Sequence, residues 1–375
     1  MTPSRGLYNR GAMRDRPRAL VYRPGSLGDT LVALPAIAEI RRQYPRHRLT
    51  LLTESPVSGS GRVSPWTILG ESGWFEDAQF YVVRPDTVGD RLRNVALALR
   101  LRARAYDEMF SLAPPRNPRQ LRTDAFIFRG VVGGRHYHAA PHPWPDGNGG
   151  GFHGPVDHEG LRLLRIVAPR ASGSTLSDFR LTVPAVEQAR SVHLLSDLGV
   201  QPDQFLVGVG PGSGRATTTW PAERFAAVGH ALLQQFRDVV LLAIGGPNEQ
   251  RLCDQLCAAW GPRSHSLAGR LSVLGSASIL SRCATFIGND SGPVHLAAMV
   301  GVPCVAIFSA RNAPGQWEPL GGHHIVLQER PECAGCMLDE CVHEGNKCLT
   351  RIQTGPVVRG AVALLESRGA ARLAV

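Results

Sequence analysis

Long apolar runs are scarce in this chain of 375 residues: the richest, at positions 239–244, has only the length of a β-strand. A helix that spans a membrane needs about 20 apolar residues in succession, so we expect no segment to cross a bilayer. The first twenty residues also lack the apolar stretch of a secretory signal, although they carry five arginines. We therefore predict a disordered basic tail over residues 1–17 and a cytoplasmic protein.

Aromatic residues are few, at 6% of the chain, and lysine is nearly absent, since Lys347 is the only one among 41 basic side chains. The net charge is nevertheless +10, which favours phosphorylated small molecules, acidic membrane surfaces or nucleic acids as partners. No helix-turn-helix, zinc-finger or RNA-binding signature is present. Because aromatics are also scarce, we expect no nucleic-acid partner.

Strand-like and helix-like segments alternate along two stretches of the chain, which join near residues 168–184. The first stretch predicts strands at 18–23, 49–53, 79–83 and 106–112, with helices at 29–44 and 86–104. The second predicts strands at 205–210, 239–244, 285–288 and 302–308, with helices at 184–198, 221–236, 247–260, 272–283 and 292–300. Such alternation is typical of parallel sheets covered by helices on both faces. We predict an α/β protein with two doubly wound domains, 18–175 and 176–354, followed by a helix within 355–375 that packs on either domain.

Residues 133–160 break the alternation with a Gly-rich run and four prolines. We interpret them as a long flexible loop beside a ligand. A metal site is less favoured, because the histidines lack interleaved carboxylates at ligand spacing. These histidines are His136, His138, His142, His153 and His158.

The segment 23–30, Arg-Pro-Gly-Ser-Leu-Gly-Asp-Thr, lies between a predicted strand and a predicted helix. Small residues there let backbone amides approach a ligand, and the start of a helix favours anions. The pattern is neither a Walker A loop nor a dinucleotide-binding fingerprint. For Asp29 two interpretations stay open: a helix cap, which its position favours, or a general base.

Two further segments follow predicted strands in the second half. Residues 210–215, Gly-Pro-Gly-Ser-Gly-Arg, precede three threonines and a Trp-Pro pair, and these hydroxyls and amides suit pyrophosphate oxygens. Residues 288–295, Gly-Asn-Asp-Ser-Gly-Pro-Val-His, open another helix. There Asp290 and Ser291 are predicted caps, and His295 could bind phosphate through its imidazolium or its N–H, although a structural role is the default for a lone histidine.

Together these motifs resemble glycosyltransferase family 9, the lipopolysaccharide heptosyltransferases. The resemblance covers residues 18–355 and includes Gly28-Asp29 followed by Leu34-Pro35-Ala36, and the Gly-Gly-Pro-Asn-Glu turn that ends at Glu249. It implies a GT-B fold of two Rossmann-like domains. It also implies metal-independent, inverting transfer of a heptose or related sugar from ADP-heptose to a lipopolysaccharide core or a similar glycan.

The resemblance makes Asp29 the base that takes a proton from the acceptor. It assigns donor binding to Ser213, Thr217, Thr218, Glu249, Asp290, Ser291, Gly292 and His295, and to these we add Arg215. On the acceptor side we predict Arg23, Ser26, Gly28, Arg116 and Arg119, although a solvated face explains the last two, with Arg122, equally well. Family members commonly carry a lysine where this chain has Thr218, and Arg215 is our candidate for the missing cation.

Four cysteines, Cys333, Cys336, Cys341 and Cys348, lie within sixteen residues and begin with a C-x2-C pair. They predict either a structural Zn or Fe site or free, redox-active thiols. No cofactor is required for the predicted reaction.

The predicted partners are a nucleotide-sugar donor and a lipid-linked glycan acceptor. Transient contact with the anionic inner membrane, at its cytoplasmic face, follows from that acceptor. Two alternatives remain: a sugar-nucleotide epimerase on the same fold, and a non-catalytic protein that binds anionic ligands.

Overall fold

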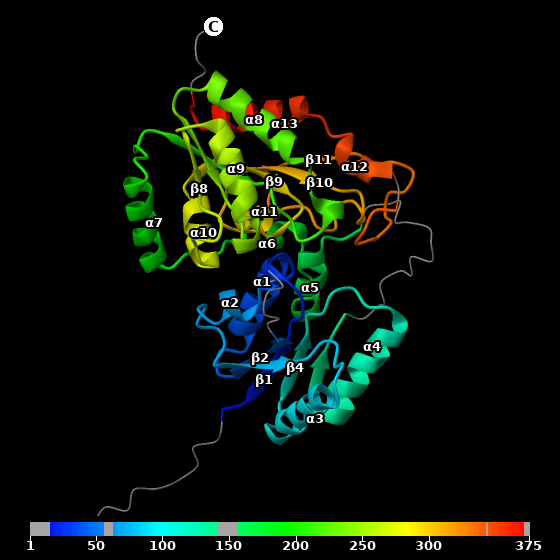
Figure 1. The fold of residues 1–375 in the computed structure, drawn as a ribbon. Coiled ribbons are helices and arrows are strands. Elements are labelled where there is room, and N and C mark those ends of the chain that lie inside the picture. Colours follow the sequence, from blue (N-terminus) through cyan, green and yellow to red (C-terminus); the bar gives the residue numbers. More distant parts are fainter. Residues whose placement is uncertain (1–15, 56–62, 141–155, 343, 371–375) are drawn as a thin grey trace, which may run out of the picture.

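The computed structural model describes residues 16–55, 63–140, 156–342 and 344–370, and it builds them into two parallel sheets, one in each half of the chain (Figure 1). The predicted tail over residues 1–17 therefore falls almost wholly outside the described residues, as do His142 and His153. The first sheet has the order β3-β2-β1-β4-β5. Its strands are β1 (Arg18–Tyr22), β2 (Arg48–Glu54), β3 (Asp77–Tyr81), β4 (Glu108–Ser111) and β5 (His136–His138).

The second sheet has the order β11-β10-β9-β6-β7-β8, and every neighbouring pair in it is parallel. Its central strands are fully buried apolar runs, as expected where helices cover both faces. The strands are β6 (Phe205–Gly210), β7 (Val239–Ala243), β8 (Ser264–Ser266), β9 (Cys283–Asn289), β10 (Cys304–Phe308) and β11 (Ile325–Gln328).

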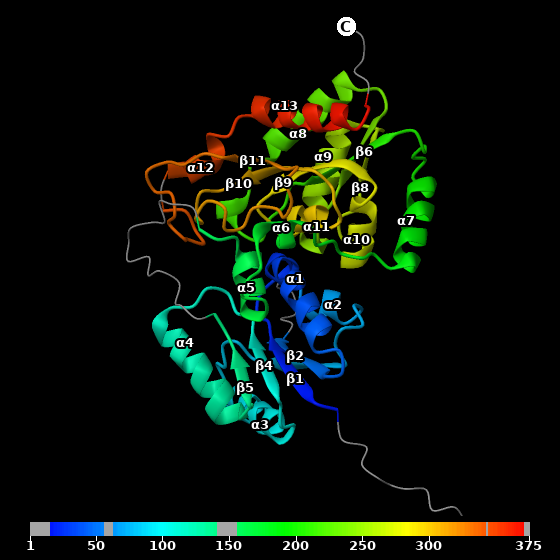
Figure 2. The same ribbon diagram turned by 180° about the vertical axis from the view of Figure 1, so that it is seen from behind.

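Helices cover both sheets, and Figure 2 shows them from the opposite side. The N-terminal domain carries α1 (Leu27–Gln43), α2 (Trp66–Leu69), α3 (Val88–Ala103), α4 (Pro118–Ala125), α5 (Glu159–Val167) and α6 (Gly173–Ser177). Helix α4 continues directly into a π-helical segment, η1 (Phe126–Val132). The C-terminal domain carries α7 (Ala185–Asp197), α8 (Ala222–Gln235), α9 (Gln250–Trp260), α10 (Val273–Leu280), α11 (Gly292–Met299), α12 (Lys347–Thr350) and α13 (Thr354–Ser367). Among the described residues, no helix combines the length and the apolarity that crossing a membrane requires.

The two domains meet where α1 packs against α11. A Cβ added to Gly28 would lie 3.2 Å from His295 Cδ2, and one added to Gly292 would lie 2.7 Å from Leu27 Cδ2. The small size of glycine thus permits this close packing, because a Cβ at either position would require the facing His295 or Leu27 side chain to shift. The carboxyl ends of β1 and β9, which lead into these helices, face one another across this contact.

The structure confirms the predicted α/β class and the two parallel sheets. The prediction of an unbroken loop over residues 133–160 is wrong in part, because His136–His138 pair with β4 as a fifth strand. The edge strands β8 and β11 were also missed. Helix α13 packs on α8 and on the second sheet, so the C-terminal helix belongs to the C-terminal domain.

Candidate active site

The loop after β1 folds Asp29 back over the start of α1. Asp29 Oδ2 accepts hydrogen bonds from Ser26 N at 2.7 Å and from Ser26 Oγ at 2.8 Å. Gly25 makes this possible: its φ is +116°, and a Cβ there would lie 2.7 Å from the Asp29 side chain. Ser26, not Asp29, is the N-cap residue of α1, so the cap interpretation needs correction: Asp29 lies in the first turn and bonds back to the cap. Its side chain remains 24% exposed and is within reach of a ligand.

Arg23 lies beneath this carboxylate and has no exposed surface. One end of its guanidinium donates to Leu112 O, and Nη2 lies 3.8 Å from Asp29 Oδ1. Burial lowers the pKa of Arg23, and Asp29 and the buried Glu159 act in the opposite direction. The prediction of Arg23 as an acceptor-side contact is corrected here, because its guanidinium is sealed under Asp29 and is suited to positioning that carboxylate.

The hydroxyls after β6 bond largely to the chain itself. The Ser213 and Thr218 hydroxyls are 2.5 Å apart, and Thr217 Oγ1 donates to Asp339 O at 3.2 Å. Both threonines are buried. Of the four predicted donor-binding residues in residues 213–218, Ser213 and Arg215 keep side chains that are accessible to a ligand.

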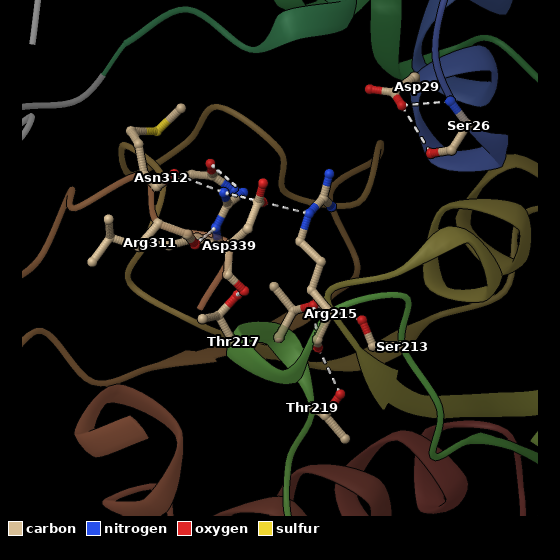
Figure 3. Close-up of polar contacts among 12 residues, drawn as sticks. Ser26, Asp29, Ser213, Arg215, Thr217, Thr219, Arg311, Asn312 and Asp339 are labelled. Atoms are coloured by element: carbon tan, nitrogen blue, oxygen red, sulfur yellow. Dashed lines mark hydrogen bonds and ion pairs between the residues drawn. The ribbon is translucent and has the colours of Figure 1, made fainter. Parts of the chain in front are cut away.

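Two arginines converge on Asp339 beside this turn (Figure 3). Arg215 Nε donates to Asp339 Oδ1 at 2.8 Å, and Arg311 Nη2 donates to the same oxygen at 3.1 Å. Arg311 also donates from Nε to Leu338 O, which fixes its guanidinium. In Figure 3 the Arg215 side chain extends from the C-terminal domain on the side where Asp29 and Ser26 lie.

Sequence reasoning missed Arg311 and Asp339. A signal for Arg311 was available, because it follows β10 at the sheet edge that also carries residues 210–215 and Asp290. Burial raises the pKa of Asp290 to about 7, with Arg311 and then Arg215 acting in the opposite direction. The carboxyl of Asp290, whose pKa is raised, therefore lies within the electrostatic influence of the two guanidinium groups that pair with Asp339.

Glu249 joins the same sheet edge from the turn after β7. Its Oε2 accepts a hydrogen bond from Gly246 N at 2.7 Å. A Cβ added to Gly212 would lie 1.8 Å from Glu249 Oε1, so the carboxylate lies directly on the 210–215 turn. Burial raises the pKa of Glu249. Two motifs that are far apart in sequence thus form one surface.

Helix α11 begins at the domain contact, where the predicted residues Ser291 and Gly292 are half-buried. Ser291 is its N-cap residue, but its Oγ donates to Asn289 O at 3.3 Å and leaves the first amides of the helix unbonded by that side chain. His295 lies one turn further on and is 4% exposed. Burial lowers its pKa to about 4, so near neutral pH the ring is uncharged and could bind a phosphate only through an N–H.

The predicted acceptor-side arginines differ in their surroundings. Arg116 lines a pocket with an empty volume of about 310 Å³, together with Ser111, Leu121 and Arg162. Its Nε lies 3.2 Å from Asp124 Oδ2, and Arg162 forms an ion pair with the buried Glu159. Arg119 does not line this pocket and is exposed on α4, which agrees with the solvated-face interpretation for that residue.

The four clustered cysteines line a second pocket, with an empty volume of about 360 Å³, next to Arg311. The pKa of Cys348 is raised by burial and by the other three cysteines. Within the described residues, no three His, Cys, Asp or Glu side chains are arranged to hold a metal ion. The four cysteines therefore line the same pocket, but their side chains are not arranged to coordinate a metal ion.

Residues 178–346 match the family model described as glycosyltransferase family 9 (heptosyltransferase). Lipooligosaccharide heptosyltransferase 2 of Campylobacter jejuni is 29% identical over 171 residues, which are 43% of this chain and 51% of that protein. The matched part of the chain thus spans about half the length of this curated relative.

Solved structures extend the similarity to both domains. A glycosyl transferase family 9 structure from Veillonella parvula matches with a TM-score of 0.69 and 18% identity, covering 94% of this chain and 98% of that one. The iron-containing dodecameric glycosyltransferase TibC of enterotoxigenic E. coli, also solved with ADP-D-beta-D-heptose, matches with a TM-score of 0.52 and 15% identity, covering 94% and 77%.

Two Rossmann-like domains that meet at the carboxyl ends of their sheets define the GT-B fold of glycosyltransferases. Residues 178–346 are thus similar to glycosyltransferase family 9, and the described chain as a whole shares the fold of a solved family 9 structure.

Proposed function

We propose that this protein is an inverting, metal-independent glycosyltransferase that moves a heptose from ADP-heptose to a lipopolysaccharide core or similar lipid-linked glycan. The observation that carries the proposal is the Asp29 carboxylate, which is held by Ser26, partly exposed, and located where the N-terminal domain meets the donor-side motifs. The heptosyltransferase name of the curated relative and the ADP-heptose bound to TibC support the choice of donor.

In the proposed reaction, an acceptor hydroxyl gives its proton to Asp29 as its oxygen attacks the anomeric carbon. The bond from that carbon to the diphosphate oxygen breaks, and its electron pair leaves with the diphosphate. Attack from the opposite face inverts the anomeric configuration. Both hydrogen bonds from Ser26 end on Oδ2, so Oδ1 is the oxygen we propose as the base.

The developing charge on the diphosphate needs a cation, because Thr218 replaces the lysine of the family. We assign that role to Arg215, whose side chain is 49% exposed and forms an ion pair with Asp339. A diphosphate that displaces Asp339 would take over a charge-assisted hydrogen bond from Arg215. Arg311, held by Leu338 O, supplies a second positive charge behind it.

The cysteines have a structural role in this proposal. Their shared pocket, the C-x2-C spacing and the iron in TibC support a Zn or Fe ion that ties residues 333–348 together, although the thiols as described do not form its coordination shell. Asp339 lies within this segment, so a metal there would fix the partner of Arg215 and take no part in the chemistry.

The test is release of ADP from ADP-heptose, measured with and without a delipidated lipopolysaccharide core acceptor. We expect release that depends on the acceptor. Conversion of the donor without any acceptor would indicate an epimerase, and donor binding without either reaction would indicate a binding protein.

A further inference from the structure

Helix α3 is apolar on two opposite faces. Leu97 and Leu101 are buried in the core of the N-terminal domain. On the other side, residues at spacings of four, three and four fall on one face of a helix. These residues are Val88, Leu92, Val95 and Leu99, and between 56% and 73% of each is exposed. One face of α3 therefore faces its own core, while the other faces away from the protein.

The adjacent π-helical segment η1 extends this exposed apolar surface. Phe126 is 69% exposed, and Ile127 and Val131 are 40% and 36% exposed. Arg102 of α3 donates to Gly130 O and Val131 O, both at 3.0 Å, so the two helices are joined side by side. Figures 1 and 2 show α3 and α4 on the part of the N-terminal domain that lies away from the C-terminal domain. We call the exposed surface of α3 and η1 the outer face.

Basic side chains border the outer face. Residues 88–103 and 118–132 contain seven arginines and two aspartates. Both aspartates are in ion pairs, Asp90 with Arg93 and Asp124 with Arg116. At 100° per residue, Arg91 and Arg102 flank one side of the α3 stripe and Arg93 and Arg100 flank the other. An apolar strip between two rows of arginines is the pattern of a helix that lies in a membrane interface.

We propose that the outer face docks this protein on an anionic lipid surface, with the apolar strip at the level of the acyl chains and the arginines on headgroup phosphates. A second copy of the chain is a poorer occupant, because pairing this face with itself would bring the arginine rows of both copies together. The proposal deepens the proposed function, since a lipid-linked acceptor would lie in the same surface.

The test uses the full chain with vesicles of phosphatidylethanolamine and phosphatidylglycerol, compared with vesicles of phosphatidylcholine. We expect sedimentation with the anionic vesicles. The variant Leu92→Ser with Leu99→Ser should bind them at least about tenfold more weakly, because each leucine loses its apolar burial in the lipid. Arg91→Gln with Arg100→Gln should weaken binding to the anionic vesicles alone.

The matched control is Val186→Ser with Val192→Ser, which removes two exposed apolar side chains, 56% and 46% accessible, from α7 in the C-terminal domain. This control should bind as the unmodified chain does. The proposal is overturned if the α3 variant also binds normally, which would point instead to the arginines of residues 1–17, or if the unmodified chain ignores anionic vesicles. It is equally overturned if the unmodified chain binds no vesicles but forms a dimer in analytical ultracentrifugation, and the α3 variant abolishes that dimer.

Transfer to a water-soluble acceptor separates this proposal from the proposed function. The α3 variant should transfer to that acceptor at the normal rate while losing vesicle binding. Normal transfer without any vesicle binding overturns the docking proposal alone, and vesicle binding without transfer by the unmodified chain overturns the proposed function alone.

Discussion

Replacing Asp29 with asparagine separates its two roles. The amide oxygen of the new side chain would still accept hydrogen bonds from Ser26 N and Ser26 Oγ, which Asp29 now accepts at 2.7 and 2.8 Å. The amide cannot take a proton from an acceptor hydroxyl. It also removes the negative charge that lies 3.8 Å from the buried Arg23. The substitution should therefore keep the start of α1 while it removes the base and one partner of Arg23.

The structure gives a magnitude for each effect. Because the bonds to Ser26 survive, the loss of capping should stay below about 1 kcal/mol. Full Coulomb attraction across 3.8 Å would be about 4 kcal/mol at an effective dielectric constant of about 20. Exposure of Asp29 and the remaining charge of Glu159 reduce this. We expect a destabilisation of roughly 1–3 kcal/mol and a fall in turnover of about 10²–10⁴-fold, as for removal of a general base.

The assay is acceptor-dependent ADP release, with binding of ADP followed by thermal shift and stability by urea unfolding. Ser26→Ala is the matched control: it removes one hydrogen bond to Asp29 and keeps the carboxylate. We expect it to lower stability by no more than about 1 kcal/mol and turnover by less than about tenfold. If Asp29→Asn turns over within tenfold of the unmodified enzyme, Asp29 serves only the start of the helix and the proposed mechanism fails.

Three further outcomes are expected. Arg215→Ala should weaken binding of an ADP-sugar about tenfold, and adding Arg311→Ala should weaken it further; unchanged affinity in the double variant would place the cation elsewhere. Affinity for an ADP-sugar should fall as pH rises from 6 to 8, because Asp290, with a pKa of about 7, becomes a carboxylate beside the diphosphate, and Asp290→Asn should flatten this profile. Since the same pKa lies above that of an unfolded aspartate, Asp290 should also destabilise the fold as pH rises from about 4 to 7. Elemental analysis of anaerobically purified protein should find about one Zn or Fe per chain and none in Cys336→Ser, whereas a metal-free unmodified chain would mean free thiols.

The central strands of both sheets could be predicted from sequence, because strands buried on both faces are continuous apolar runs. The edge strand β3 was also predicted, but β5, β8 and β11 were not. Strands β5 and β8 are three residues long and partly polar, so pairing with a neighbour defines them and composition does not. The motif residues that directly follow the central strands could be located as well, because the apolar runs show where each strand ends. Arg311 and Asp339 lie far from those motifs in sequence, and only the folded chain brings Asp339 against Arg215.

The burial of Arg23 illustrates a second limit. A charged residue in a loop beside a ligand motif predicts a surface contact, since arginine is rarely buried without a partner. Here Leu112 O and the charges of Asp29 and Glu159 provide for its guanidinium inside the domain. These partners are distant in sequence or share the local turn, so no periodicity or spacing indicates that the side chain points inward.

The glycine contacts between α1 and α11 have a mechanical consequence. Each helix start packs a side chain of one domain against a glycine of the other: the His295 ring against Gly28, and Leu27 against Gly292. If the domains rotate when a donor binds, that contact is the point about which they would pivot, because atoms already in contact cannot approach further. Asp29 is the next residue after Gly28 and so lies close to the pivot. When the domains open and close, the parts farthest from this contact would move most. Asp29 would move least relative to α11.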